Sequence, residues 1–239
     1  MTFRYLQEMG LGARQTETFE RFRDLLLEGN KRFNLTAIIE PEEVEIKHFV
    51  DSLLLRENRL WQESFADVDR KVRVADVGGG AGFPGIALKI CDEHMAMDVL
   101  EASMKKVRFL QELAAALELS DIQALHKRAE EAGRDPGCRE GYDWVLARGV
   151  AHAPVLLEYC LPLVKTGGYM AAYKGLAGLR EAEEGRKAAA LLGGELVEMM
   201  RKSLPAGMGE RCILVYRKTS VTPEKYPRPP GMPAKKPLV

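Results

Sequence analysis

The chain lacks an excess of charge of either sign. Its 239 residues include 35 Lys and Arg against 35 Asp and Glu, so the overall charge does not favour nucleic acid or a membrane surface. A local basic patch can still bind RNA when the total is neutral. The chain also lacks a run of eighteen apolar residues and a charged-then-apolar leader after Met1, which predicts a soluble, cytoplasmic protein without membrane partners.

Cysteine is also scarce. The four cysteines are widely separated, form no Cys-x-x-Cys pair and have no histidine cluster beside them. Disulfide frameworks and zinc sites depend on such spacing. We therefore expect neither, and no metal is predicted at the functional site.

The most informative stretch that is present runs from Val72 to Gly85. It begins as a short β-branched run, reaches a carboxylate at Asp76 and then contains five glycines within eight residues. Glycines let the backbone approach a ligand, and Pro84 suits the first turn of a helix. The stretch predicts a strand, a tight loop and a helix N-terminus whose N–H groups meet a nucleotide-type cofactor.

The rest of the chain alternates between strand and helix patterns. Further strands are expected at 95–100, 122–125, 142–147, 168–173, 195–200 and 212–216, and helices between them at 86–91, 105–119, 155–163 and 179–192. This alternation predicts an α/β fold with a doubly wound, mostly parallel, seven-stranded sheet of the Rossmann-like type. The last two strands have no helix between them, which predicts a terminal antiparallel hairpin.

Three regions are expected along the chain. Residues 1–65 have helical spacing, with a bend or an end expected at Gly29-Asn30, and are interpreted as an N-terminal helical cap. Residues 66–218 form the cofactor-binding domain. Residues 219–239 are rich in proline, lysine and arginine. They are expected to be extended and mobile, either as a basic arm or as a solvated tail.

Two cofactors compete for the glycine loop. Gly80 to Gly85 matches the Gly-x-Gly-x-x-Gly pattern of dinucleotide sites. Asp76 and Gly78 ahead of it fit better the loop of S-adenosylmethionine-dependent methyltransferases, and Glu101 would accept ribose hydroxyls with either cofactor. The terminal hairpin favours the methyltransferase, so S-adenosylmethionine is the preferred cofactor. An NAD-dependent oxidoreductase is kept as the alternative.

Several segments then resemble one family, the bacterial 16S rRNA guanine-N7 methyltransferases, also called the glucose-inhibited division protein B family. The resemblance extends from about Arg32 to Leu238 and is most specific at Phe83-Pro84-Gly85. It is carried by Asn34-Leu35-Thr36, His48 with Asp51-Ser52, Asp76 to Gly85, Lys105 to Leu110, Ala129-Glu130, Arg148, Lys174-Gly175, Tyr226-Pro227-Arg228, Gly231 and Pro233-Ala234-Lys235. The chain departs from the family pattern at Gly79, where Ser or Thr is frequent, and beside Arg148.

The resemblance implies methyl transfer from S-adenosylmethionine to N7 of guanine 527 in the 530 loop of 16S rRNA. The partner would be this RNA or a small ribosomal subunit precursor, and the protein is expected to be a monomer. The implied cofactor-binding residues are Asp76, Gly78, Gly80 and Phe83 in the loop, Glu101, Ala102 and Ser103 at the ribose, Ala129 and Glu130 at the adenine, and Arg148 at the mouth shared with the substrate.

The chemistry needs no general base, because guanine N7 has a free lone pair at neutral pH. Catalysis is expected to depend on alignment and on donors toward guanine O6. Arg148 and Lys174 are the candidate catalytic residues that would hold guanine or a phosphate, with a salt bridge at the strand end as the alternative for each. His48 is expected to be a packed histidine. A splayed loop base is the expected target.

Lys31, Arg32 and the tail are the expected contacts to RNA. A non-catalytic RNA-binding assembly module on the same fold is a further alternative. It would bind the cofactor without transferring a methyl group.

Overall fold

The computed structural model describes residues 3–238 and is built around one seven-stranded sheet of order β3-β2-β1-β4-β5-β7-β6. The strands are β1 Val72–Val77, β2 Met95–Glu101, β3 Ile122–His126, β4 Tyr142–Arg148, β5 Val164–Lys174, β6 Gly194–Ser203 and β7 Glu210–Lys218. The pairs among β1 to β5 are parallel, and β7 is antiparallel to both of its neighbours. The predicted fold, with its terminal hairpin, is confirmed.

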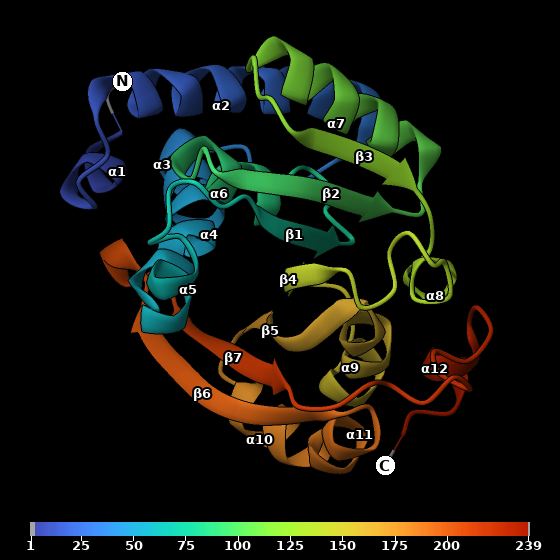
Figure 1. The fold of residues 1–239 in the computed structure, drawn as a ribbon. Helices are drawn as coiled ribbons and strands as arrows, with labels where there is room; N and C mark the ends of the chain where they lie inside the picture. Colours follow the sequence, from blue (N-terminus) through green and yellow to red (C-terminus); the bar gives the residue numbers. More distant parts are fainter. Residues whose placement is uncertain (1–2, 239) are drawn as a thin grey trace.

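Helices cover both faces of this sheet, as the buried side chains of parallel strands require. One face packs against α2, α6 and α7, and the other against α8, α9, α10 and α11. Their bounds are α2 Ala13–Phe33, α6 Gly85–Cys91, α7 Met104–Ala116, α8 Ala129–Ala132, α9 Ala153–Cys160, α10 Gly178–Glu184 and α11 Arg186–Leu191. Figure 1 shows α2 and α7 lying together across the first face.

The N-terminal helices share one apolar cluster with the sheet. They are α1 Arg4–Glu8, α2, α3 Pro41–Val44, the π-helix η1 Glu45–Val50, α4 Asp51–Leu53, the 3₁₀-helix η2 Leu54–Glu57 and α5 Arg59–Ser64. Phe22 and Phe49 of this region are fully buried in the same cluster as Val74 of β1. The cap is therefore built on the core of the sheet, and it positions residues 45–51 beside the glycine loop.

Helix α2 does not end at Gly29-Asn30 but runs on to Phe33. A Cβ at Gly29 would lie 2.5 Å from the ring of Phe109 on α7. The glycine therefore lets two helices approach closely, and packing against α7 outweighs its low helix propensity. The expectation of a bend or an end there was wrong.

The C-terminal tail is folded against the protein. Tyr226 is buried, Arg228 pairs with Glu158, and residues Met232–Lys235 form the short helix α12. In Figure 1 this helix lies beside α8, at the edge toward which β1, β2 and β3 point. The expectation of an extended, mobile tail was wrong.

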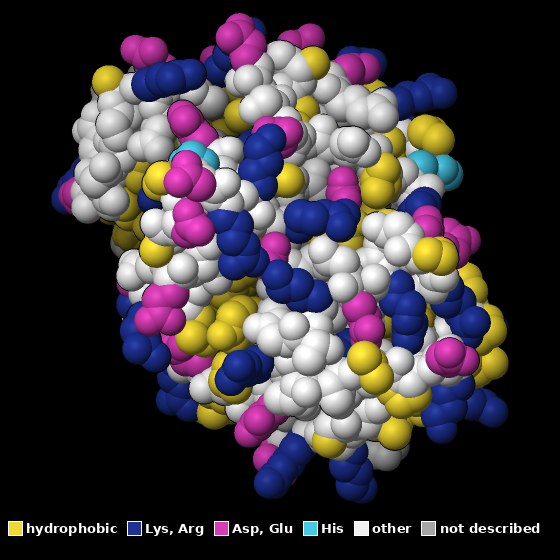
Figure 2. Space-filling model, viewed as in Figure 1, with side chains coloured by type: hydrophobic (Ala, Val, Ile, Leu, Met, Phe, Trp, Pro, Cys, Tyr) yellow, Lys and Arg dark blue, Asp and Glu magenta, His cyan; other side chains and the backbone are white. Residues whose placement is uncertain are grey.

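The described residues carry charges of both signs on the surface. Figure 2 shows Lys and Arg interspersed with Asp and Glu over one face, without a large patch of one sign. The four cysteines are free thiols. Within residues 3–238, no helix is long and apolar enough to cross a membrane, and no group of three or more His, Cys, Asp or Glu side chains could hold a metal ion.

Candidate functional site

A cavity of about 180 Å³ lies at the carboxyl ends of β1, β2 and β3. In open α/β sheets, ligands bind at this edge. Five of the predicted cofactor residues line this cavity together: Gly78, Glu101, Ala102, Ala129 and Glu130. They come from separate segments of the chain, so the fold brings together residues that the sequence keeps apart.

The glycine loop between β1 and α6 depends on backbone conformations that other residues rarely adopt. Gly78, Gly80 and Gly82 have φ values of 73°, 58° and 97°. Gly85 begins α6, and a Cβ there would lie 2.6 Å from the Asp76 carboxylate. The dense run of glycines is thus explained by left-handed turns and by a close approach to Asp76.

Asp76 lies beneath this loop and has no exposed surface. Its Oδ2 accepts a hydrogen bond of 2.9 Å from the N–H of Gly85, and within residues 3–238 its Oδ1 has no partner. Burial raises the pKa of Asp76 to about 7. Asp76 is not among the residues that line the cavity, and it fixes the conformation of the glycine loop by accepting from Gly85.

Glu101 connects the loop to the next strand end. Its Oε2 accepts a hydrogen bond of 3.1 Å from the N–H of Gly80, and its Oε1 accepts one of 2.8 Å from the N–H of Ser103. Each carboxylate oxygen keeps a further lone pair, so the same group can accept a hydrogen bond from a ligand in the cavity.

Phe83 lies on the cap side of the loop. Its ring is stacked between those of His48 and Phe22, with ring centres 4.5 and 5.0 Å away and both pairs 13° from parallel. The guanidinium carbon of Arg148 lies 5.0 Å from the centre of the Phe83 ring. The far end of the glycine loop is therefore fixed to the cap.

Arg148, at the end of β4, is ion-paired to the cap. Its Nη1 donates to Asp51 Oδ2 at 2.8 Å and to the Lys47 carbonyl at 3.1 Å. The other Asp51 oxygen accepts from Arg211 Nε at 3.0 Å. The sequence had placed Asp51 only in a family motif and gave no signal for Arg211. The pairing means that Arg148 holds the cap against the strand end.

His48 is a neutral imidazole inside this network. Burial, followed by the nearby charge of Arg148, lowers the pKa of His48 to about 3. Arg148 Nη2 donates to His48 Nδ1 at 3.2 Å, so the ring proton lies on Nε2 and is donated to Thr36 Oγ1 at 2.8 Å. His48 belongs to the π-helix η1, a type of turn that often occurs at functional sites.

Lys174 is paired beside the loop that follows β4. Its Nζ donates to the carbonyl of Ala151 at 2.6 Å and lies 2.7 Å from Glu181 Oε2. Its side chain is only 9% exposed. Glu181 Oε2 also accepts from the N–H of Ala153 at 3.0 Å. Lys174 is thus held in the salt bridge that had been the alternative interpretation, although this salt bridge is buried.

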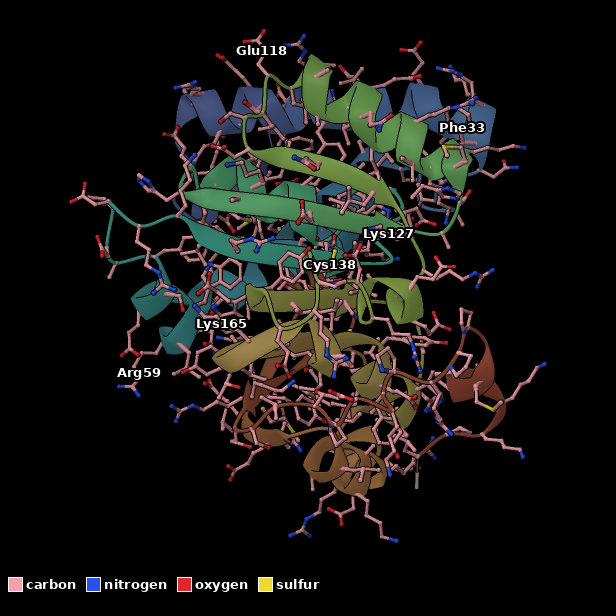
Figure 3. The ribbon with its side chains drawn as sticks, turned by 45° about the vertical axis from the view of Figure 1, so that its right-hand side comes forward. Phe33, Arg59, Glu118, Lys127, Cys138 and Lys165 are labelled. Carbon is pink, nitrogen blue, oxygen red and sulfur yellow. The ribbon has the colours of Figure 1, made fainter. Side chains whose placement is uncertain are left out.

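The cavity wall also contains residues that sequence reasoning did not select. They include Lys127, Val150 and Tyr159. Figure 3 labels Lys127, which follows the end of β3 and is ion-paired with Asp135. Only their positions in the sequence could have indicated these residues, because each follows a predicted strand or lies on the helix after it.

Comparisons with known proteins agree on one family. The family model described as rRNA small subunit methyltransferase G, GidB, matches residues 15–208. A protein named ribosomal RNA small subunit methyltransferase G from Bacillus cereus is 46% identical over 235 residues, which is 98% of this chain and 95% of that protein. A protein of the same name from Bacillus thuringiensis (strain Al Hakam) matches to the same extent.

Solved structures show the same fold at low identity. A mutant of a 16S rRNA (adenine(1408)-N(1))-methyltransferase from Catenulisporales acidiphilia has a TM-score of 0.53 and 13% identity, over 71% of this chain and 92% of that one. A putative sarcosine dimethylglycine methyltransferase from Galdieria sulphuraria has a TM-score of 0.54 and 13% identity, over 70% and 84%.

Proposed function

Because the chain belongs to the rRNA small subunit methyltransferase G family, we propose that it transfers a methyl group to N7 of guanine 527 in the 530 loop of 16S rRNA. It is an S-adenosylmethionine-dependent methyltransferase. The observation that carries the proposal is the cavity at the carboxyl ends of β1 to β3. Gly78, Glu101 and Glu130 line this cavity. They lie in the glycine loop, at the end of β2 and in the helix after β3, which is the edge where sheets of this type bind their ligands.

The cofactor is proposed to lie along this cavity. Glu101 would accept hydrogen bonds from the ribose hydroxyls, and Ala129 and Glu130 would border the adenine. Gly78 would let the backbone come close to the ligand because it has no side chain. Asp76, Gly80 and Ser103 would act by fixing the positions of these groups.

In this reaction the protein has to align the cofactor with guanine N7 and does not have to transfer a proton. S-Adenosylmethionine supplies an electrophilic methyl group when it is bound. Guanine N7 attacks with its own lone pair, so no side chain has to remove a proton. Positive charge would pass from the sulfonium to the purine as neutral S-adenosylhomocysteine is released. A donor toward O6 would orient the base, and acceptor oxygens near N1–H would stabilise the charge on the ring. We propose that Arg148 positions the cap and the loop for this step, and that Lys174 positions residues 149–152.

The substrate is proposed to be 16S rRNA within a small ribosomal subunit or its precursor, in the bacterial cytoplasm. Lys31 and Arg32 are exposed at the end of α2 and can contact RNA. Charges of both signs are mixed on the surface in Figure 2, which favours a folded ribosomal substrate over tight binding to naked RNA. One chain is proposed to act as a monomer, because one chain supplies both the cavity wall and the cap.

The test is methylation of small subunits from cells that lack this gene. Wild-type protein with S-adenosylmethionine should produce N7-methylguanine at position 527, and Glu101→Ala should lose most of the activity through weaker cofactor binding. An unmodified 530 loop would refute the proposal. Cofactor binding without methyl transfer would favour the assembly-module alternative, and a thermal shift with NAD alone would favour an oxidoreductase.

A further inference from the structure

We propose that the C-terminal tail, residues 219–238, is a clamp that holds one wall of the cofactor cavity in place and thereby sets the affinity for S-adenosylmethionine. The inference rests on the cofactor placement proposed above. The wall in question is made by Ala129 and Glu130 of α8 and by Tyr159 of α9. The tail is bound to both of these helices.

The first attachment is to the cavity wall itself. The N–H of Gly231 donates to Glu130 Oε1 at 2.9 Å, and Glu130 is only 4% exposed. A nearly buried carboxylate takes up a fixed orientation only where donors hold it. Gly231 supplies such a donor from more than a hundred residues farther along the chain, with a φ of 80° that favours glycine.

The second attachment fixes α9, three residues earlier in the tail. Glu158 has no exposed surface, and its carboxylate accepts from the N–H, Nε and Nη2 of Arg228 at 2.8, 2.9 and 2.6 Å. A buried carboxylate needs a partner of this quality, because its loss would leave an unpaired buried charge. Arg228 and Gly231 therefore tie α9 and α8 to one short piece of chain.

The third attachment holds the tail to the segment that follows α8. Arg139 donates to the carbonyls of Thr222 and Tyr226 at 2.7 and 2.8 Å, and Arg134 Nε donates to the carbonyl of Pro227 at 2.8 Å. Figure 1 shows the resulting arrangement, with α12 beside α8. The tail is thus bonded to the wall and to the segment after α8, and no residue of 219–238 is among those that line the cavity.

The test changes the tail without shortening it. Gly231→Val places a β-branched residue at a left-handed position and moves the N–H away from Glu130. Gly10→Val is the matched control, because Gly10 also has a φ of 80° and open space at its Cβ but lies between α1 and α2. Binding of S-adenosylmethionine and of S-adenosylhomocysteine is measured by calorimetry, and melting temperatures are recorded without ligand.

Gly231→Val should raise the Kd for both ligands about tenfold or more, as the loss of one hydrogen bond to a charged group predicts. Gly10→Val should leave Kd unchanged at a similar loss of melting temperature. Glu130→Met should raise Kd by itself, and Gly231→Val should have no further effect in that background. Glu130→Gln, which keeps an acceptor oxygen, should restore the response to Gly231→Val.

An unchanged Kd in Gly231→Val, an equal increase in Gly10→Val, or full additivity with Glu130→Met would each overturn the clamp. These results concern cofactor binding alone, so they leave the proposed methylation of rRNA standing. Wild-type protein that binds no S-adenosylmethionine would overturn both. The double variant Lys235→Gln/Lys236→Gln should leave the Kd unchanged. A higher Kd in this variant would assign the effect to the positive charge of the tail and would also overturn the clamp.

Discussion

The ring of Phe83 lies almost parallel to the imidazole of His48, with 4.5 Å between the ring centres. Phe83 belongs to the glycine loop, and His48 belongs to the cap. Arg148 touches both, because it donates to His48 and lies over the Phe83 ring. The glycine loop and the cap are therefore joined through this stack. On the proposed function, the loop binds the cofactor and the cap borders the substrate, so substitutions at the stack should separate cofactor binding from methyl transfer.

His48→Phe keeps a flat ring on Phe83 but removes the acceptor for Arg148 and the donor to Thr36. We expect the affinity for S-adenosylmethionine to stay within about twofold and the methylation rate on small subunits to fall about tenfold. His94→Phe, at an exposed histidine just before β2, is the control and should change neither. Equal losses of affinity and rate in His48→Phe would contradict this separation.

The same histidine predicts a dependence of stability on pH. The folded state lowers the pKa of His48 to about 3, so between the ordinary value near 6.5 and about 3 the unfolded chain binds more protons. Stability is therefore lost as the pH falls through this window, by up to about 1.4 kcal/mol per pH unit for one such group. Urea unfolding of His48→Phe between pH 7 and pH 4 should show a shallower loss than the wild type.

Asp76 should contribute with the opposite sign. Its pKa is raised from 3.8 to about 7, so the folded state binds more protons in that window, and this group makes the protein less stable as the pH rises. Asp76→Asn keeps an acceptor for the N–H of Gly85 and removes the charge. Its free energy of unfolding relative to wild type should therefore increase from pH 4 to pH 8. A constant difference across that range would mean that Asp76 does not titrate there.

Part of the fold and of the candidate site can be predicted from the sequence alone. The sheet, the loop and the position of Glu101 follow from local patterns, because strand periodicity and glycine spacing are read within a few residues. The partners of Arg148 and Arg228 do not, because Asp51 lies 97 residues from Arg148 and Glu158 lies 70 residues from Arg228. The proline-rich, basic tail is predicted to be solvated because the sequence does not show that the buried Glu158 carboxylate pairs with Arg228.

Arg148→Lys tests whether the fork of the guanidinium matters. Lysine keeps the charge but cannot reach Asp51 and His48 in the same geometry. We expect a loss of stability of about 1.5 kcal/mol, because the buried Asp51 carboxylate loses a well-placed donor but still accepts from Arg211. Methylation should fall about tenfold or more while cofactor affinity is retained. Arg108→Lys, at an exposed arginine of α7, is the matched control.

Variants at Lys174 can distinguish a positioning role of this residue from direct contact with the substrate. Lys174→Met leaves Glu181 nearly buried without its cation and should lower the free energy of unfolding by about 3 kcal/mol. Arg180→Met, which breaks an exposed pair with Glu184, should cost about 0.5 kcal/mol or less.

Adding Glu181→Gln to Lys174→Met removes the unpaired charge and keeps an acceptor for the N–H of Ala153. If Lys174 only holds residues 149–152, stability and methylation should both recover toward wild type in this double variant. If Lys174 touches guanine or a phosphate, stability should recover and methylation should stay low. Methylation of small subunits, measured together with urea unfolding of the same variants, decides between the two. We expect recovery of both, because the Nζ of Lys174 already has Ala151 and Glu181 as partners within 2.7 Å.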